Sequence, residues 1–478
     1  MADRKDEEKM SMLVVKVPRN SYLLEFNYII KVLLASFLGL DYMIEAHNND
    51  KIVIKLREDK SDKVLVIENV LFNMPIEKWL KESSLPLTPL PQWDVSVDLP
   101  ELKLCDKKLP VIYGRKLSNG RYFEQEENYL HLGLDIFGSC FFMLTRYEEI
   151  VLKERDKHER FPAKASLAYK EEFLLRPIVN EYVEVLWAAM KRLWPGLNRK
   201  QHSYKVLLTH DVDHPFMVCN QSWYQLFRNI GGDILKRRDF GLAIQRWKCK
   251  IQNNPELDPA NTFDFIMDLS EKYGLKSEFY FMTDHTAGSL DGSNYSIDSP
   301  DIKALMSKIY KRGHTIGFHA SYNTFRDYQQ TKKEFEKLIV VAEKLGIKQD
   351  SWGGRQHYLR WENPTTWQNW NDAGLNYDST LSFADYVGFR TGTCYEYTVF
   401  NILKRRILQL KERPLIVMDC TLSGENYMNL EKEDSLMYIK QLSLNCKKFG
   451  GNFVILWHNT SLVLRWQRSV YQEILKLL

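Results

Sequence analysis

The sequence predicts an α/β protein made of two parts, an α+β domain over residues 1–200 and a domain of repeated strand–helix units over residues 203–478. From Ser203 onward, short apolar strands alternate with amphipathic helices. This rhythm is typical of a parallel sheet, either open or closed into a barrel. The preceding part lacks the alternation and contains a proline-rich stretch, LPLTPLPQW, which is typical of an extended linker. A length of 478 residues agrees with two or three domains.

Apolar patterning places the elements of the N-terminal part. Pro177 begins a helix through VNEYVEVLWAAMKRLW, and GLDIFGSCFFMLTRYEEI has apolar residues at the spacing of a buried helix. This part contains no motif that predicts chemistry. Its other predicted elements are strands at 12–17, 51–56 and 64–67 and a helix near 29–38.

Start and stop residues delimit the helices of the C-terminal part. Ser299 and Pro300 begin a helix that ends at Gly313, while Gly346 and Gly374 end two others. The predicted strands are 205–209, 277–283, 315–318, 414–419 and 452–457, and the predicted helices are 263–273, 300–312, 325–345, 365–373 and 431–448, with a last helix at the end of the chain.

Composition restricts the class of protein. The net charge of +4 is too near balance to argue for nucleic acid or an anionic membrane as a partner. The seven cysteines form no C-x-x-C pair, so reduced thiols are expected rather than disulfides or a cysteine-based zinc site. The opening residues MADRKDEEKM lack the apolar core of a signal peptide, and the apolar stretch 28–42 is too short to span a bilayer. We therefore expect a soluble, cytoplasmic protein without a membrane span.

Polar side chains follow several predicted strands. His210 to His214 come after KVLLT, His319 after TIGF, Asp419 at the end of PLIVMD, and His458 after NFVILW. Because the carboxyl ends of parallel strands meet at one edge of a sheet or barrel, these residues are predicted to converge.

The spacing of the polar residues suggests a metal site. Asp211 and Asp213 are two apart, so an extended segment directs both carboxylates to one side, where one can bind a cation and the other accept a proton. His319 and Asn323 are four apart, as on one turn of a helix, and both side chains can ligate a divalent ion. Taken alone, Asp211 and Asp213 could simply form an acidic loop, and His319 could be a structural histidine.

The ordered stretches LLTHDVD, SEFYFMT, RGHTIGFHASYN, GGRQHYLR, AGLNYDSTLSF and ILWHN resemble the motifs of the polysaccharide deacetylase family, carbohydrate esterase family 4, whose shared unit is the NodB-homology domain. The resemblance covers about residues 203–478. It implies a distorted (β/α) barrel and a hydrolase that removes an N-acetyl group from an amino sugar in a polysaccharide or glycan precursor. It also implies a divalent metal as cofactor, zinc foremost, with cobalt or nickel as alternatives.

The resemblance also implies roles for individual residues. Asp211 corresponds to the general base, which Arg355 would hold in place. Asp213 and His319 correspond to metal ligands, and His458 to the general acid. Two further positions are Asn323, which stands where the family has a second ligand histidine, and Asp419, which would orient His458.

Several positions depart from the family pattern. Val212 separates the two aspartates, which leaves open which of them is the base and which the ligand. Ala320 replaces the serine or threonine of the histidine motif. Asn323 makes a weaker ligand than histidine, so His314, His214 or water could complete the site. The arginine motif reads Arg-Gln-His-Tyr without the usual proline, which suggests a site role for His357.

Aromatic residues beside the motifs are candidates for stacking on sugar rings, with core packing as the alternative for each. Arg390 in the loop GFRTGT is a candidate for binding a charged substituent, with a structural role as its alternative. The aromatic candidates are Tyr322, Trp352, Tyr358 and Trp361, and His357 joins them as a candidate for substrate binding. Trp457 also lies beside a motif, but core packing is the favoured interpretation for it. The expected partner is a carbohydrate and not a nucleic acid, and the sequence does not determine the oligomeric state.

Two other functions compete with a deacetylase. One is a hydrolase of the same fold that acts on a small cyclic or linear amide. The other is a non-catalytic carbohydrate-binding or scaffold protein that has kept the fold without a working metal site. Serine hydrolases and nucleotide-binding proteins are disfavoured because the sequence lacks G-x-S-x-G, P-loop and G-x-G-x-x-G motifs. A cytoplasmic deacetylase would act on a precursor such as a nucleotide sugar or a lipid-linked sugar.

Overall fold

A computed structural model describes residues 12–219, 221–292 and 295–478 of this mixed α/β protein. The segment 1–10, from which the absence of a signal peptide is predicted, lies outside the described residues. Among the described residues, no helix combines the length and apolar character that crossing a bilayer requires.

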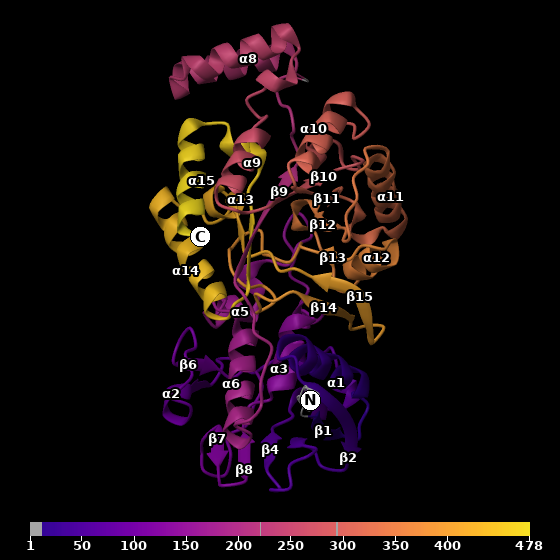
Figure 1. Ribbon diagram of the computed structural model, residues 1–478, viewed down its shortest axis with the longest axis vertical. Coiled ribbons are helices and arrows are strands. Elements are labelled where there is room, and N and C mark those ends of the chain that lie inside the picture. Colours follow the sequence, from indigo (N-terminus) through magenta and orange to yellow (C-terminus); the bar gives the residue numbers. More distant parts are fainter. Residues whose placement is uncertain (1–11, 220, 293–294) are drawn as a thin grey trace, which may run out of the picture. The chain divides into compact units, whose positions relative to one another are not determined.

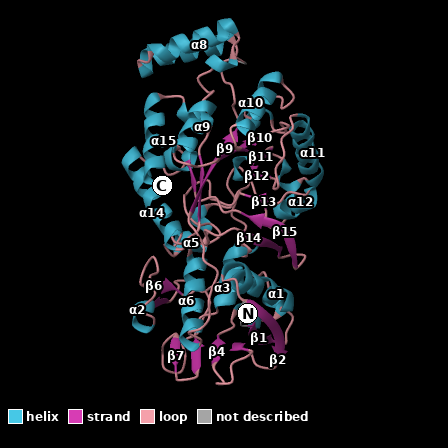
Figure 2. Ribbon diagram, in the orientation of Figure 1, coloured by secondary structure: helices cyan, strands magenta, loops and turns pink. Residues whose placement is uncertain are grey.

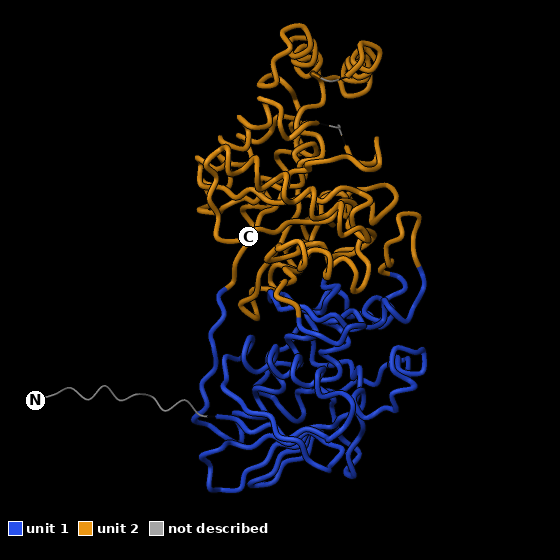
Figure 3. Tube along the Cα trace, turned by 90° about the vertical axis from the view of Figure 1, so that its right-hand side faces the viewer, with its two compact units in different colours: residues 1–154, 164–203, 389–407 blue, residues 155–163, 204–388, 408–478 orange. Residues whose placement is uncertain are grey.

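The chain divides into two compact units, which Figure 3 shows in different colours. Two short segments do not follow a single division near residue 200. Residues 155–163 belong to the unit that holds most of the C-terminal part, and residues 389–407 belong to the other. The first unit comprises residues 1–154, 164–203 and 389–407, and the second comprises residues 155–163, 204–388 and 408–478.

The first unit contains a six-stranded sheet in the order β2-β1-β3-β4-β8-β7. Three of its strands, β1, β3 and β4, are those that apolar alternation predicted, so these predictions are confirmed. The strands are β1 (Met12–Pro18), β2 (Asp41–His47), β3 (Ile52–Leu56), β4 (Val64–Ile67), β7 (Phe123–Gln125) and β8 (Tyr129–Leu132).

Helices pack together beside this sheet. Every residue of α3 (Ile136–Leu144) is buried, as its continuous apolar sequence predicted, and the helix packs against α1 (Leu23–Ile30) and α6 (Ile178–Leu193). α1 begins earlier than predicted and continues as a π-helix over Lys31–Phe37. The smaller elements are α2 (Val95–Asp98), α4 (Glu148–Val151), α5 (Leu167–Lys170), β5 (Gln92–Asp94), β6 (Lys108–Pro110) and β14 (Tyr397–Asn401).

The second unit contains a row of parallel strands in the order β15-β13-β12-β11-β10-β9-β17-β16. The row ends at β16, so these strands do not close into a complete ring. The parallel sheet predicted from the strand–helix alternation is confirmed. The strands are β9 (Lys205–Val212), β10 (Ser277–Phe281), β11 (Thr315–Ala320), β12 (Gly353–Gln356), β13 (Tyr377–Asp378), β15 (Arg406–Glu412), β16 (Val417–Met418) and β17 (Asn452–Leu456).

Helices cover these strands, as Figures 1 and 2 show. α9 packs against β10, α10 and α11 pack against β11, and α14 packs against β17. The chain also forms two helices between β9 and α9, α7 (Trp223–Gly232) and α8 (Phe240–Gln252), which were not predicted. The covering helices are α9 (Phe263–Lys272), α10 (Pro300–Lys311), α11 (Tyr328–Lys344), α12 (Thr365–Ala373), α14 (Lys432–Lys448) and α15 (Arg465–Leu477), with α13 (Asp419–Ser423) directly after β16.

Candidate metal centre and its surroundings

Four strands of the second unit carry polar residues at or just beyond their carboxyl ends. Asp211 lies near the end of β9 and His319 near the end of β11, where it is the register partner of Arg355 on β12. His458 directly follows the residue after β17, and Asp419 directly follows β16. Because all these strands run parallel, their carboxyl ends share one edge, and the structure brings these side chains together there.

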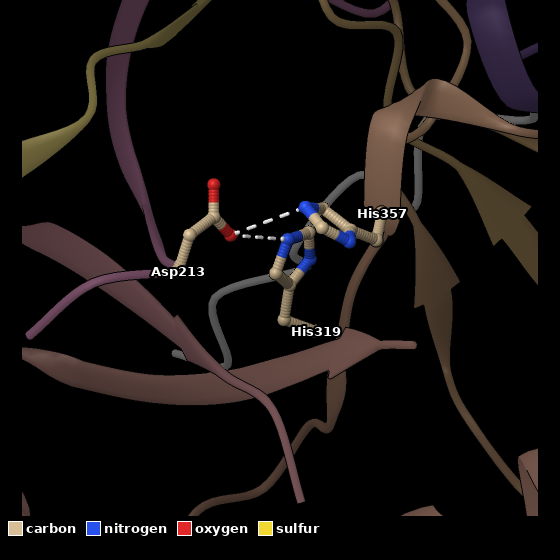
Figure 4. A group of neighbouring side chains, drawn as sticks. All are labelled: Asp213, His319 and His357. Carbon is tan, nitrogen blue, oxygen red and sulfur yellow. Dashed lines mark ion pairs between the residues drawn. The ribbon is translucent and has the colours of Figure 1, made fainter. Parts of the chain in front are cut away.

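Asp213, His319 and His357 form a compact group of potential metal ligands (Figure 4). One ligand atom from each lies within 4.8 Å of the others. Asp213 Oδ1 lies 3.0 Å from His319 Nε2 and 3.6 Å from His357 Nε2. One carboxylate and two imidazoles are a donor set that zinc and similar ions accept in catalytic sites.

The orientation of His319 supports this assignment. Its Nδ1 donates to the carbonyl oxygen of Arg355 at 2.9 Å, so Nε2 of the neutral ring carries a lone pair. Nε2 is buried and makes no hydrogen bond of good geometry. It faces two carboxylates, with Asp213 Oδ1 at 3.0 Å and Asp211 Oδ2 at 3.8 Å. A proton on Nε2 or a cation among the three groups is needed to offset this repulsion, and the residues therefore fit a divalent ion.

His357 is held by a buried carboxylate. Its Nδ1 lies 3.2 Å from Asp291 Oδ1, which also accepts the backbone N–H of Tyr322 at 2.6 Å. The backbone of Ala287 donates to the other oxygen of Asp291 at 2.6 Å. Since Nδ1 faces a carboxylate, it carries the hydrogen, and Nε2 is left to face Asp213. A carboxylate behind a histidine in this way is a common support for a metal ligand.

Charge is concentrated around this group. Burial opposes ionisation of Asp213, yet the neighbouring His357 and His319 hold its pKa well below the ordinary range. Burial likewise opposes protonation of His357, but the carboxylates of Asp213 and Asp291 raise the pKa of this imidazole to about 9. The two shifts have one origin, the attraction between these carboxylates and a positive charge on the neighbouring imidazole, and a bound cation would be attracted in the same way.

Asp211 is fixed by a buried arginine. Arg355 Nη1 donates to Asp211 Oδ1 at 2.8 Å, and its other nitrogens donate to Thr209 Oγ1 at 3.0 Å and to the carbonyl oxygen of Ser379 at 2.9 Å. The guanidinium is completely buried. One oxygen of Asp211 is therefore bound to Arg355, while the other faces His319.

His458 and Asp419 form a second tightly bound pair. His458 Nδ1 donates to Asp419 Oδ1 at 2.7 Å, and its backbone N–H donates to Oδ2 at 2.9 Å. The other ring nitrogen, Nε2, lies 3.6 Å from Asp213 Oδ2. Burial lowers the pKa of His458, but Asp419 raises it to a net value well above the usual range. The Asp419 carboxylate therefore favours the protonated form of His458, which faces the metal group.

These groups open into a cavity of about 260 Å³. Asp211, Asp213, His357 and His458 supply its ionisable surface, and Leu359 and Met418 supply buried apolar surface. The remaining lining residues are Arg160, Tyr358, Cys420 and Tyr427.

Arg160 reaches the cavity from the segment 155–163. Its Nε donates to Asp156 Oδ2 at 2.8 Å, its Nη1 to the carbonyl oxygen of Tyr358 at 2.9 Å and its Nη2 to the hydroxyl of Tyr427 at 3.3 Å. Arg160 thereby fixes both tyrosines that line the cavity.

Asn323 does not share a helical face with His319. His319 lies on β11, and Asn323 is an exposed residue at the start of a 3₁₀ turn, because the strand ends at Ala320. The side chain of Asn323 donates to the carbonyl oxygen of Thr286 at 2.9 Å and accepts from Arg360 Nη1 at 3.3 Å. His357 takes the third position of the group in its place.

Arg390 and Trp361 are core residues rather than surface binding groups. Arg390 lies in the first unit, is 2% exposed, and donates to Glu149 through Nε at 2.9 Å and Nη2 at 2.5 Å. Trp361 is buried against Trp367, with 4.7 Å between ring centroids. Both side chains are therefore unavailable to a ligand at the surface.

The other two aromatic candidates also lie outside the cavity lining. Tyr322 is buried beneath the guanidinium of Arg360, and its hydroxyl lies 2.9 Å from His158 Nδ1. Trp352 is half-buried. Of the four predicted stacking residues, only Tyr358 lines the cavity.

Asp291, Arg160 and Tyr427 were not predicted. The only local signal was the dipeptide Asp291-Gly292, which is typical of a turn and carries no chemistry by itself. Gly292 has φ +79°, and a Cβ there would lie 2.4 Å from the carbonyl oxygen of Asp213. Glycine thus lets the Asp291 turn approach the Asp213 loop closely.

Comparison with known proteins gives limited matches. Residues 13–195 match a family of unknown function, DUF7033. No curated protein matches the chain. Similar solved structures include a Mycobacterium smegmatis protein described as a polysaccharide deacetylase, which is 15% identical to this chain. The similarity covers 58% of this chain and 84% of that chain, with a TM-score of 0.36.

Two further solved structures are similar at the same level. The Puue allantoinase has 12% identity, 59% of this chain and 85% of that chain covered, and a TM-score of 0.34. A Pseudomonas aeruginosa PAO1 protein described as a polysaccharide deacetylase has 11% identity, 59% of this chain and 89% of that chain covered, and a TM-score of 0.34.

Proposed function

We propose that the second unit is a metal-dependent hydrolase that removes an N-acetyl group from an amino sugar in a polysaccharide or glycan precursor. The observation that carries this proposal is the buried group of Asp213, His319 and His357, in which His319 Nε2 faces carboxylates without a hydrogen bond. A fixed carboxylate and a protonated imidazole adjoin this group, as amide hydrolysis requires. The first unit is proposed as an accessory α+β domain.

Asp213, His319 and His357 would hold the metal, with zinc the first choice and cobalt or nickel as alternatives. A divalent ion bound there would polarise the amide carbonyl and lower the pKa of a bound water. His357 strengthens the donor set that the sequence suggested, because imidazole is a better ligand than the amide of Asn323 for these ions.

Asp211 is the proposed general base. Arg355 binds one of its oxygens and leaves the other directed toward the metal group. This arrangement supports Asp213 as the ligand and Asp211 as the base, since an oxygen of Asp213 lies near both histidines. Asp211 accepts a proton from the attacking water, and the resulting hydroxide adds to the carbonyl carbon of the N-acetyl group.

His458 is the proposed general acid. It is protonated, its Nδ1 is held by Asp419, and its Nε2 faces the cavity. When the carbon–nitrogen bond breaks, Nε2 donates its proton to the leaving nitrogen, which gives acetate and a free amine. Asp419 acts as a positioning residue that keeps the ring oriented and charged.

The cavity lining suits an acetylated sugar. Leu359 and Met418 offer apolar surface for the acetyl methyl group, and Tyr358 and Tyr427 offer faces on which a sugar ring can stack. A volume of about 260 Å³ lies just below the range of about 300–1,000 Å³ typical of ligand sites. The cavity therefore encloses about one monosaccharide unit.

The same small volume supports a second candidate, a hydrolase of small cyclic or linear amides. Besides histidine, two aromatic residues line the cavity, Tyr358 and Tyr427, and this number is small for a site that binds a sugar chain. Substrate selection separates the candidates, because a deacetylase releases acetate from N-acetylated sugars and a small-amide hydrolase does not.

Calorimetric titration of the full chain with zinc, cobalt and nickel tests the proposal. We expect micromolar or tighter binding that is lost in Asp213→Ala and in His319→Ala. Acetate release from N-acetylglucosamine-containing precursors is then measured with the metal-loaded protein. Absence of metal binding by the wild type would refute the hydrolytic mechanism and favour a non-catalytic carbohydrate-binding or scaffold protein.

A further inference from the structure

The helices α7 and α8 form a hairpin with a small core of its own. Val218, Leu226 and Cys249 are buried together between the two helices, with partly buried Ile230 beside them. Asp233 is completely buried and pairs with Arg246 at 2.7 Å, which fixes the turn between the helices. In Figure 1, α8 lies beyond α9 and α10 rather than against the strands.

The outer face of this hairpin is apolar and exposed. Along α8, Phe240, Ile244, Trp247 and Ile251 follow a 4-3-4 spacing that places them on one face, although the buried residues of α8 lie on the opposite face. Phe240 is 62% exposed and Ile251 is 57% exposed. A stripe at this spacing normally faces a core, so its exposure indicates an interaction surface.

The apolar stripe of α8 continues onto α7. The Trp247 ring lies 6.2 Å from both Trp223 and Phe227, measured between ring centroids. Trp223 is 49% exposed and Phe227 is 57% exposed. Tyr224, Ile234 and Leu235 of the same hairpin are also exposed.

The hairpin that carries this apolar surface is rich in basic residues. Residues 222–254 contain seven lysines and arginines against two aspartates, a local net charge of +5 in a chain whose whole net charge is +4. One of the two aspartates, Asp233, is buried. Five of the basic side chains are exposed, namely Arg228, Lys236, Arg237, Arg238 and Lys248. Because the net charge of the whole chain is small, it does not reveal this local excess of positive charge.

We infer that the α7–α8 hairpin docks on the surface of an anionic phospholipid bilayer. Exposed tryptophan, phenylalanine and isoleucine beside lysine and arginine are the composition of helices that lie in the plane of a membrane interface. Contact between two copies of this surface would bring five exposed basic residues on each side together, and like charges oppose such pairing. An anionic lipid surface instead complements both the apolar face and the charge.

The hairpin contributes to a pocket that lies close to the proposed metal group. A pocket of about 380 Å³ is lined by Gln221, Gln225 and Arg228 from the hairpin and by His214, which follows the proposed metal ligand Asp213. Docking would thus place this pocket, one residue away from Asp213, near the lipid headgroups. Resting on the proposed function, we further infer that the substrate is an N-acetylated glycan attached to a lipid.

Sedimentation of the full chain with lipid vesicles tests the docking. We expect binding to vesicles of phosphatidylcholine mixed with phosphatidylglycerol, weaker binding to phosphatidylcholine alone, and a decrease of binding with added salt. The triple variant Phe240→Ser, Ile244→Ser, Trp247→Ser should lose binding. Trp466→Ser removes a tryptophan of α15 that is more exposed than Trp247 (62% against 44%) and should bind like the wild type.

A charge variant provides a second measurement. Lys236→Glu with Lys248→Glu should weaken binding to the anionic vesicles by at least about tenfold, since one basic residue near such a surface contributes about fivefold. Asp213→Ala should bind vesicles normally, so failure of the metal site and failure of docking are distinguishable. The inference would be overturned if the wild-type protein did not bind anionic vesicles. It would also be overturned if the wild type formed dimers that the triple variant abolished.

Discussion

His319 donates its Nδ1 hydrogen to the backbone carbonyl oxygen of Arg355, its register partner on the neighbouring strand, at 2.9 Å. The same Arg355 donates from its side chain to Asp211 at 2.8 Å. One residue of β12 therefore sets both the orientation of a proposed metal ligand and that of the proposed base. The first contact joins the adjacent strands β11 and β12, and the second reaches from β12 across the carboxyl ends of β11 and β10 to β9, so the strand row itself holds the two groups in place.

The identity of the third ligand can be tested directly. His357→Ala should weaken zinc affinity by more than about 100-fold, since loss of a supporting contact alone typically costs 10- to 100-fold and a ligand contributes more. Asn323→Ala should leave the affinity unchanged because the Asn323 side chain is exposed and bound to Thr286 and Arg360. Calorimetric titration measures both. A larger loss of zinc affinity in Asn323→Ala than in His357→Ala would instead identify Asn323 as the ligand.

Asp291 is expected to act through His357. Asp291→Asn should lower zinc affinity by about 10- to 100-fold because the carboxylate that orients the imidazole is lost. Asp284→Asn serves as the control, since Asp284 lies in the same loop but pairs with Lys333 at 3.0 Å. Equal affinities for Asp291→Asn and the wild type would mean that the 3.2 Å contact with His357 has no effect on the ligand.

Metal affinity should depend on pH through His357. The pKa of this imidazole in the metal-free protein is raised to about 9, so below that pH a proton must leave before the ring can bind a cation. We expect affinity to increase by about tenfold per pH unit between neutral pH and about 9 and then to level off. Titrations in buffers of different ionisation enthalpy would detect the released proton. Affinity that is constant over this range would contradict the assignment.

Asp419→Asn should shift the alkaline limb of the pH–rate profile. His458 must be protonated to act as an acid, so activity falls as pH rises through its pKa. Asp419 is the main group that raises this pKa, and its neutralisation should move the fall to lower pH by about one to two units. Asp434→Asn is the control, because it neutralises an exposed carboxylate on α14. An unmoved limb would remove His458 from the role of acid.

Arg390 should affect stability and not the site. Arg390→Ala leaves Glu149 buried with one fewer partner, which we expect to lower the free energy of unfolding by about 3–5 kcal/mol. Arg19→Ala removes an exposed arginine from the same unit and should change it little. Denaturant unfolding and zinc titration of both variants are the measurements. Weakened zinc binding by folded Arg390→Ala would show a functional role that its burial does not suggest.

The sequence by itself determined part of the parallel strand row of the second unit and the residues at several of its strand ends. Apolar periods of about two and 3.6 residues are local properties, so β9, β10, β11 and β17 and most of the covering helices could be predicted without tertiary contacts. The placement of Asp211, Asp213, His319 and His458 followed, because parallel strands direct their carboxyl ends to one edge. The strands β12, β13 and β15 and the helices α7 and α8 were not predicted.

Only the tertiary structure decided what completes this edge. His357 precedes two residues with positive φ, Tyr358 at 59° and Leu359 at 55°, and no periodic pattern predicts where such a turn directs a side chain. Asp291 is 66 positions away from its partner His357 in the sequence, and Arg160 comes from a segment that precedes the second unit's strands. Contacts between segments so far apart depend on packing in three dimensions, which the spacing of residues along the chain does not encode.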